Sequence, residues 1–344
     1  MVWRMLQSLT QVATSAPDLF PDSAAAKQYW PDLREYIRIA HTYYRAASTT
    51  GGVASALPLY YSALQLAKAE LLVKDPHSVF QKEAHHGLTF RPERSKSMRS
   101  DKLRVRSGVF RSLYRARTGL AIDDGTNIPV KALLQRLPDI GFEVAHVKLG
   151  PPTFQSFEHY VGHDGAQAWS LVTIPNDSVC WKSAATRKRL LDKYRRVAPW
   201  HNTPAPADHV VLESVCAHTL LSPNLCVADD QDRVCGEAMK ALAPLVGSPI
   251  YLMQVMAPSL VGGEFLPMPP DLARYASIFY LSSVIRYKPS RVSEDAKTDD
   301  PWLLSALVAE AGVHLVRSFL DQISGTQYLF ASPEATALRS SNLK

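Results

Sequence analysis

Val53 to Lys74 reads VASALPLYYSALQLAKAELLVK, and this stretch decides the fold class. Its apolar residues recur at alternating intervals of four and three, which lines them along one side of an α-helix. They are Val53, Leu57, Tyr60, Leu64, Ala67 and Leu71. Ser55 is placed to cap the start, and Pro58 falls in the first turn, where a missing amide hydrogen costs nothing. Such a face must be covered by other helices.

The N-terminal side supplies two of those helices. Ser23 to Tyr29 is predicted to form a short helix that ends before Pro31, since a residue preceding proline resists the helical region. A second helix is predicted to begin at Pro31 and to turn through Gly51 and Gly52 into the central stretch. The second helix and the central stretch should therefore form an antiparallel hairpin.

The C-terminal third returns to helices. Asp271 caps a helix that runs to Pro289 and is apolar around most of its circumference, so we expect it at the centre of a bundle. Asp300 and Pro301 begin the last long helix, which Gly325 stops. The two ends of the chain are thus predicted to pack together.

The middle of the chain has a different pattern. Lys102 to Arg106 alternates basic and apolar residues as a strand does, and the helical spacing resumes from Val109 to Arg117. Turns and apolar alternations follow to residue 182, then a basic helix, Ala184 to Val197, and an apolar strand or buried helix, Asp208 to Thr219. The predicted fold is mainly α: residues 23–117 and 271–325 form one helical bundle, and residues 118–270 form an α/β or β-rich region packed on it.

Composition is that of a globular protein. The 344 residues include 46% hydrophobic and 20% charged side chains. Four irregularly spaced cysteines do not make a disulfide framework, and the N-terminus has no apolar run of signal-peptide length, so we expect a cytoplasmic protein. The uncharged segment Ala241 to Gly263 is interrupted by prolines and glycines, which favours a buried strand, Ile250 to Met256, over a membrane span.

Several common chemistries lack their motifs. The sequence contains no GxxxxGK[ST], GxGxxG or GxSxG, which argues against P-loop hydrolysis, dinucleotide oxidoreduction and the common serine hydrolase. Cys216, His218, Cys226 and Cys235 lack the close CxxC pairs of structural zinc sites. We therefore expect no metal and no cofactor, and a binding protein rather than an enzyme.

Charge distribution is the strongest chemical signal. Residues 91–117 hold ten basic and two acidic side chains, and residues 182–196 hold seven and one, a net +14 against +6 for the whole chain. Arginines bind phosphates in bidentate fashion, and aromatic rings among them stack on unpaired bases. The predicted contact residues are Arg104, Arg106, Arg111, Tyr114, Arg115, Trp181, Arg187, Arg189, Tyr194 and Arg195. The alternatives are a solvated basic face or a docking surface for an acidic protein partner.

Two further polar sites are candidates. His85-His86-Gly87 follows the central helix, where imidazoles act as acid and base near neutral pH or bind a metal; turn chemistry alone also explains the glycine. Arg286 lies near the end of an apolar helix and needs an acceptor if it is buried, for which Glu70 and Glu83 are available. A structural ion pair is the alternative to a ligand-binding arginine.

Four stretches in order resemble the YaaC-like proteins of bacteria. They are YYSALQLAKAELL, HHGL at His85 to Leu88, RSGVFRSLY at Arg106 to Tyr114, and YLSSVIRYKP at Tyr280 to Pro289. The resemblance spans residues 30 to 325. It implies a cytosolic, mainly helical protein of bacterial or related origin, and it carries no catalytic assignment.

The helical ends also resemble HEPN bundles, which occur in RNA-cutting toxins and antiviral systems. That resemblance implies an arginine and a histidine four to six residues apart, and Arg34 and His41 have this spacing and share a helix face. Arg195 or Arg196 with His201 also fits, but Pro199 interrupts the helix that would align them. Chance alone also produces such spacings. A metal-independent ribonuclease is therefore one alternative to an RNA-binding or partner-binding protein of a bacterial stress or antiviral system.

Overall fold

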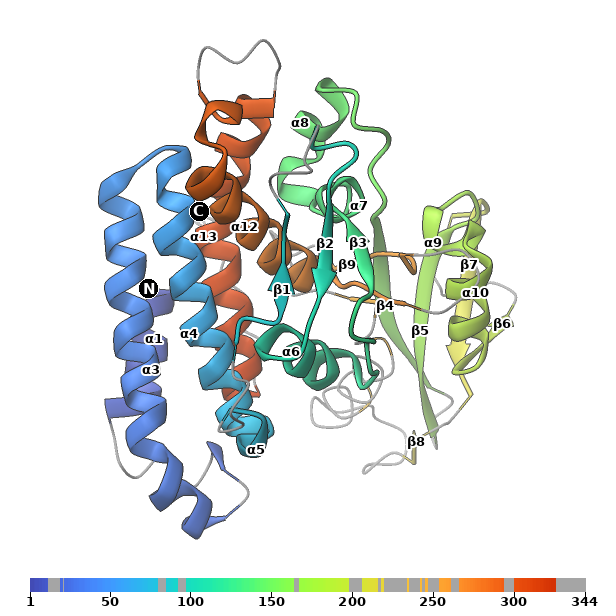
Figure 1. Ribbon diagram of the computed structural model, residues 1–344. Coiled ribbons are helices and arrows are strands. Elements are labelled where there is room, and N and C mark those ends of the chain that lie inside the picture. Colours follow the sequence, from blue (N-terminus) through green and yellow to red (C-terminus); the bar gives the residue numbers. More distant parts are fainter. Residues whose placement is uncertain are drawn as a thin grey trace, which may run out of the picture. The chain divides into compact units, whose positions relative to one another are not determined.

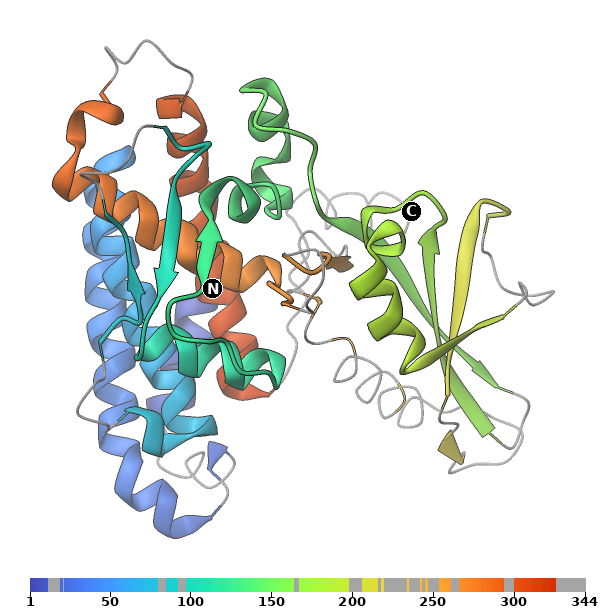
Figure 2. The same ribbon diagram turned by 45° about the vertical axis from the view of Figure 1, so that its right-hand side comes forward.

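The computed structural model describes residues 1–11, 19–20, 22–79, 85–91, 97–163, 167–197, 206–215, 218–219, 234, 242, 245–246, 254–260, 266–293 and 300–325. The chain forms two compact units (Figures 1 and 2). The first joins residues 1–152 to the chain from Pro270 onward, and the second comprises Thr153–Pro269. The fold is mainly helical with two antiparallel sheets, as predicted at that level.

Helix α4 (Ala56–Lys74) is the central helix of the first unit. It packs against helices from both parts of that unit (Figure 1), namely α3 (Ser23–Thr50), α5 (Pro76–Val79), α6 (Val109–Thr118), α12 (Pro270–Tyr287) and α13 (Asp300–Ser324). The predicted one-sided stripe is too narrow, since Leu59, Ala63 and Leu66 are fully buried while Leu57 and Leu64 are half-buried. A helix covered from several sides keeps little of the periodicity that marks a single buried face.

The start of α4 also differs from the prediction. Residues Val53–Ser55 form a short 3₁₀ turn, η2, and the Ser55 hydroxyl donates to the Gly52 carbonyl at 2.6 Å instead of capping the helix. The hairpin with α3 is confirmed.

Helix α3 runs unbroken from Ser23 to Thr50 with Pro31 inside it, so the predicted break before Pro31 is wrong. Proline removes one backbone hydrogen bond, but Pro31 lies on the exposed side of the helix while Ala26, Leu33 and Ile37 are buried. Packing on both sides of the proline outweighs the local preference. Helix α1 (Val2–Gln11) packs on α3 and α13.

The C-terminal helices follow the prediction closely. Residues 270–284 of α12 are buried throughout, and α13 ends at Gly325, whose φ of +68° is the left-handed conformation of a helix stop. A 3₁₀ turn, η5 (Pro289–Arg291), follows α12. Among the described residues, α13 alone is long and apolar enough for a membrane span by length and composition, and 67% of its most apolar window is buried inside the structure.

A three-stranded antiparallel sheet lies in the first unit. Its order is β1 (Leu88–Thr89), β2 (Lys102–Val105) and β3 (Asn127–Pro129), with Leu103 and Val105 on the buried face. This confirms the strand predicted from Lys102 and the helix predicted from Val109.

Residues 118–152 belong to the first unit, whereas the sequence-based division placed them in the middle region. Helix α7 (Val130–Leu134) packs on α12, and both η4 (Pro138–Ile140) and α8 (Gly141–His146) pack on α13. Their turns and short apolar runs do not reveal from sequence which neighbour buries them.

The second unit is a six-stranded antiparallel sheet with helices on one face (Figure 2). The strand order is β6 (Tyr194–Val197), β7 (His209–Ser214), β5 (Gln167–Pro175), β4 (Gln155–His163) and β9 (Gln254–Met256), and β8 (His218–Thr219) pairs with β5. Helices α9 (Val179–Lys182) and α10 (Ala184–Leu191) supply Cys180 and Leu190 to the core with Val172, Ile174 and Leu212.

The structure bears on three expectations for this unit. The predicted basic helix Ala184–Val197 is a helix only to Leu191, because Tyr194–Val197 pairs with β7 as a strand. The ambiguous Asp208–Thr219 segment contains strand β7. Of the predicted strand Ile250–Met256, residues 250–253 lie outside the described residues, and Gln254–Met256 is β9.

Candidate nucleic-acid interface

Strand β2 presents a row of polar side chains across the three-stranded sheet. Thr89 of β1 and Asn127 of β3 are the direct register partners of Arg104. Neighbouring strands lie about 4.8 Å apart, so the three residues form one line. Lys102 lies two residues from Arg104, on the same face and about 7 Å along the strand. Both cations are exposed, while Leu103 and Val105 face the core.

A cavity of about 310 Å³ lies over this face. It is lined by Thr89, Phe90, Arg91, Ser100, Asp101, Lys102, Arg104 and Asn127. Arg91 follows the end of β1 by two residues and lines the same cavity as Lys102. Within the described part of the chain, Arg91, Lys102 and Arg104 form no ion pair. Three cations therefore line one cavity without an ion pair to any described residue.

The carboxylate in this cavity is neutralised from the other side. Asp101 Oδ2 accepts hydrogen bonds from Tyr280 Oη at 2.7 Å and Arg291 Nη1 at 2.8 Å. Burial and the Asp101 charge raise the pKa of Tyr280 well above its ordinary value, so it stays a donor. The Phe90 ring meets the Tyr280 ring edge-on, with centroids 5.0 Å apart. Asp101 therefore does not cancel the charges of the three cations that line the cavity.

The hydrogen bonds from Tyr280 of α12 and Arg291 of η5 to Asp101 were not predicted from the sequence. Arg291 is 190 residues from its partner Asp101, and it closes the short run RYKPSR, Arg286 to Arg291. Tyr287 in that run is 61% exposed, and the Arg286 guanidinium lies 5.1 Å from its ring centroid. Three basic residues and one aromatic residue in six positions indicate a candidate anion-binding segment. The run is much shorter than the two basic segments, 91–117 and 182–196, so its charge does not stand out in the sequence.

Other predicted contact residues of the first unit separate into exposed and buried groups. Arg106 is half-buried and pairs with Asp124 at 3.0 Å, Arg111 is also half-buried, and Arg115 is exposed. Tyr114 is fully buried, so its predicted role in stacking on bases is wrong. Tyr114 has helical spacing with Phe110 and Leu113, and this face of α6 packs on α4.

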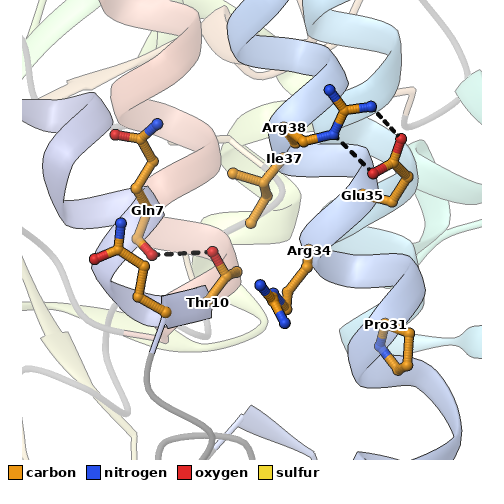
Figure 3. A pocket seen from close by; sticks show the side chains of 8 residues that line it. Gln7, Thr10, Pro31, Arg34, Glu35, Ile37 and Arg38 are labelled. Atoms are coloured by element: carbon orange, nitrogen blue, oxygen red, sulfur yellow. Dashed lines mark hydrogen bonds and ion pairs between the residues drawn. The ribbon is translucent and has the colours of Figure 1, made fainter.

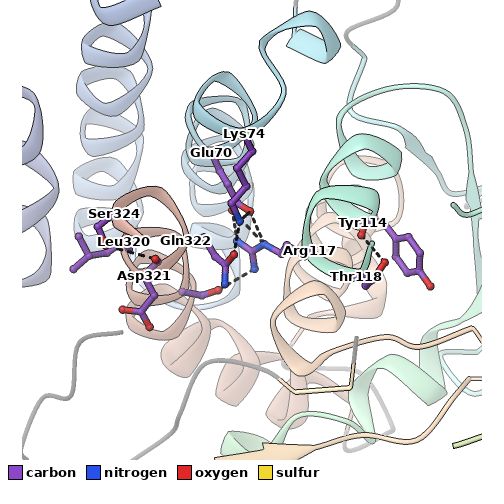
Figure 4. Close-up of polar contacts among 10 residues, drawn as sticks. Glu70, Lys74, Tyr114, Arg117, Thr118, Leu320, Asp321, Gln322 and Ser324 are labelled. Atoms are coloured by element: carbon purple, nitrogen blue, oxygen red, sulfur yellow. Dashed lines mark hydrogen bonds and ion pairs between the residues drawn. The ribbon is translucent and has the colours of Figure 1, made fainter. Parts of the chain in front are cut away.

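Arg117, counted in the basic segment, also lies in the core (Figure 4). Its Nη2 is 2.6 Å from Glu70 Oε2, and its Nη1 donates to the Ser318 hydroxyl at 2.9 Å. Burial alone would raise the pKa of Glu70, but the Arg117 and Lys74 charges outweigh it and hold that pKa below its usual range. This pair joins α4, α6 and α13, and its charge is unavailable to a ligand.

The second basic segment is similarly divided. Trp181 and Arg189 are half-buried, and Arg187 donates to the Trp181 carbonyl at 3.3 Å. Tyr194 is 2% exposed and belongs to the core, which excludes the predicted stacking role. Arg195 is exposed and pairs with the buried Glu213 across β6 and β7. The exposed cations of the segment are Lys182, Lys188, Lys193, Arg195 and Arg196.

The two basic segments belong to different units. Each segment is therefore a separate candidate contact surface.

The His85-His86-Gly87 turn has a clear structural role. The carbonyls of His85 and His86 accept hydrogen bonds from the Val109 and Phe110 amides, at 2.7 and 3.2 Å, at the start of α6. His86 is half-buried with its ring 5.2 Å from that of Phe279, and burial together with the Arg286 charge lowers its pKa. His85 is exposed. The turn satisfies backbone donors that a helix start leaves open.

Arg286 is not buried, so the condition for its expected ion pair does not hold, and a pair with Glu70 is not formed. The side chain is exposed, its Nε donates to the Ser282 carbonyl at 3.4 Å, and Glu70 is bound to Arg117 instead. The other proposed partner, Glu83, lies outside the described residues. Tyr287 turns outward beside Arg286, so the last turn of α12 leaves the core.

Arg34 lines a second cavity, of about 330 Å³, between α1 and α3 (Figure 3). Gln7, Thr10 and Ile37 line it too, and the Glu35–Arg38 ion pair lies at its edge. His41 is not among the lining residues: its Nδ1 is 3.2 Å from Gln7 Nε2, and its ring packs 4.9 Å from that of Trp3. Burial and the Arg45 charge lower the pKa of His41.

A buried charge cluster also escaped sequence analysis. Arg274 of α12 is fully buried between Asp139 at 2.5 Å and Asp271 at 3.3 Å, and the nearly buried His314 of α13 lies beside them. Asp139 lies in η4, directly after Pro138, and is 135 residues from Arg274 in the sequence. Among the described residues no group of His, Cys, Asp and Glu has the arrangement of a metal site. The zinc candidates Cys216, Cys226 and Cys235 lie outside the described residues.

The family model of the YaaC-like Protein matches residues 9–323. No curated protein and no solved structure matches the chain, and the resemblance to HEPN bundles stays a prediction. The family match covers the helical ends, the three-stranded sheet and the second unit alike. The chain therefore belongs to the YaaC-like family.

Proposed function

We propose that this YaaC-like protein binds RNA or another polyanion in the cytoplasm, with its principal contact at the cavity of the three-stranded sheet. The observation that carries the proposal is the group of three cations, Arg91, Lys102 and Arg104, at one cavity without an acidic partner among the described residues. Segment 182–196 supplies a second basic contact surface through its exposed lysines and arginines.

Electrostatics favours an anionic ligand for this cavity. Like charges that lie close together repel one another, and Arg91, Lys102 and Arg104 line one cavity. A phosphate between them converts the repulsion into two charge-assisted hydrogen-bonding contacts. The cations are exposed, so a strand reaches them without opening the core.

Salt dependence of RNA binding is the direct test. Fluorescence anisotropy with a labelled single-stranded RNA should give an affinity that falls steeply between 50 and 200 mM salt, by roughly tenfold or more for a few phosphate contacts. Lys102→Glu with Arg104→Glu should weaken binding by at least about tenfold. Lys27→Glu, an exposed lysine of α3 away from the sheet, is the matched control. Absent or salt-independent binding would remove the proposal.

The second basic surface is tested separately. Lys188→Glu with Arg196→Glu changes two exposed residues of the second unit. A loss of RNA affinity in this variant supports contact at both units, while unchanged affinity restricts the site to the first unit.

Docking of an acidic protein is the competing function for the same cations. A pull-down from cells, with and without nuclease, separates the two functions. Nucleic acid in the untreated eluate supports RNA binding, whereas a stoichiometric acidic partner that survives nuclease treatment supports an assembly subunit. The identity of the co-purified molecules also tests our proposed cellular context, a bacterial stress or antiviral system.

A further inference from the structure

We infer that the cavity beside β2 binds the terminal phosphomonoester of a nucleic-acid strand, in preference to an internal phosphodiester. This inference rests on the proposed function and specifies the chemical group that the site takes. It starts from the concentration of charge: Arg91, Lys102 and Arg104 line one space of about 310 Å³. A site that follows a backbone would instead distribute its cations along a groove.

Charge matching favours the strand end. An internal phosphodiester carries one negative charge, whereas a phosphomonoester carries about −1.5 to −2 at pH 7 and offers three strongly accepting oxygens. Asp101 does not cancel the three cations, because Arg291 and Tyr280 already hold its carboxylate. A dianionic phosphomonoester therefore neutralises more of the positive charge of these three cations than a singly charged diester does.

The donor types around the cavity also suit a phosphate group. Arg104 has a planar fork suited to two phosphate oxygens, and Lys102 is a point charge two residues away on the same face. The guanidinium of Arg104 lies beside Gly125 in the turn before β3, where an added Cβ would be 3.2 Å from Nη2. Ser100, Thr89 and Asn127 add hydroxyl and amide groups around the cations.

The volume and the apolar wall of the cavity suit a terminal phosphate together with part of its sugar. Its volume lies at the lower end of the range for small-molecule sites, which is about 300–1,000 Å³. Phe90 forms an apolar wall and is held edge-on by Tyr280. The phosphate, with part of its sugar, fills such a space, while the rest of the strand leaves along the exposed sheet face.

The test compares strand ends on one sequence. A 12-nucleotide single-stranded RNA is prepared with a 5′-phosphate, with a 3′-phosphate, or with hydroxyls at both ends, and each competes with a labelled strand for the full-length protein. We expect one phosphorylated end to bind about tenfold more tightly than the hydroxyl strand, the value of one charged hydrogen-bonding contact. The preferred end identifies whether the site reads the 5′ or the 3′ terminus.

Variants assign the preference to the cavity. Lys102→Gln and Arg91→Gln should each remove most of the discrimination between phosphate and hydroxyl ends, whereas Lys27→Gln should keep it. All three side chains are exposed, and matching circular dichroism spectra and unfolding midpoints confirm folding. Equal affinity for all three strands, or a preference that survives Lys102→Gln and Arg91→Gln together, would overturn the inference while leaving RNA binding intact. Absence of binding to every strand would overturn the proposed function as well.

Discussion

Individual arginines of this chain have opposite environments although the sequence groups them together. Arg104 and Arg117 lie 13 residues apart in one basic segment. Arg104 is exposed at a cavity, and Arg117 is buried against Glu70 with its guanidinium 4.7 Å from the Phe319 ring centroid. A buried arginine needs a carboxylate, so its charge contributes to folding rather than to ligand binding.

His314 makes the stability of the first unit dependent on pH. Burial and the positive charges of Arg274 and Arg317 lower the pKa of His314 to about 4. The negative charges of Asp139 and Asp271 oppose this shift only in part. The Glu310 carboxylate lies 3.8 Å from the ring. The unfolded chain therefore takes up the proton first as pH falls. Stability should be unaffected above about pH 6.5 and should decrease towards pH 4.

Denaturant titrations at pH 7.5 and pH 5 measure this effect. We expect His314 to remove about 2 kcal/mol of stability between these values, since each pKa unit corresponds to about 1.4 kcal/mol. His314→Gln should lose this part of the pH dependence, and His77→Gln, an exposed histidine of α5, should retain it. An identical pH profile in His314→Gln and the unmodified protein would contradict the prediction.

Arg34 and His41 give a prediction for catalysis. Arg34 lines the cavity between α1 and α3, and His41 does not. The His41 ring is hydrogen-bonded to the Gln7 side chain instead. We expect the protein to leave a single-stranded RNA intact over hours, measured on a denaturing gel. Cleavage that disappears in His41→Ala and persists in His77→Ala would establish the ribonuclease alternative instead.

At the scale of elements, the loop before β1 and the start of α6 depend on two close backbone approaches. Gly108 has a φ of +128°, and a Cβ there would lie 2.3 Å from the His85 carbonyl oxygen. Gly87 has a φ of +78°, and its Cβ would lie 2.8 Å from the Phe110 amide. The HHGL and RSGVF stretches thus fit together because each contains a glycine at the contact.

Gly108→Ala tests this contact. The substitution should destabilise the protein by at least about 2 kcal/mol, because it adds backbone strain and a collision with a carbonyl. Gly119→Ala is the control: its φ of +69° is also left-handed, but nothing lies within 4 Å of the added Cβ, so the cost should be about 1 kcal/mol. Equal losses in chemical denaturation would show that the close approach contributes nothing.

At the scale of the whole molecule, the second unit has a core of its own. Val172, Ile174, Leu190, Val210 and Leu212 are all buried within it. We therefore expect residues 153–269, expressed alone, to give a strand-rich circular dichroism spectrum and a cooperative thermal transition. A spectrum without ordered structure would show that this unit needs the first one to fold.

Secondary structure was predictable where one local pattern dominates. The apolar circumference of α12, the glycine after α13 and the alternation in β2 each follow from neighbouring residues, and each element forms as expected. The continuous α3 and the short α10 were not predictable in this way. Packing on α4 decides the first and pairing with β7 decides the second, and both partners are remote in sequence.

By itself, the sequence determined that both chain ends are helical, because apolar spacing is a local property of each helix. It also determined that positive charge is concentrated in two segments. Only the tertiary structure decided which of those charges are available, since burial and ion pairing depend on residues far along the chain. Arg117 is buried in an ion pair with Glu70. Arg291 neutralises Asp101, and Arg91, Lys102 and Arg104 line an open cavity.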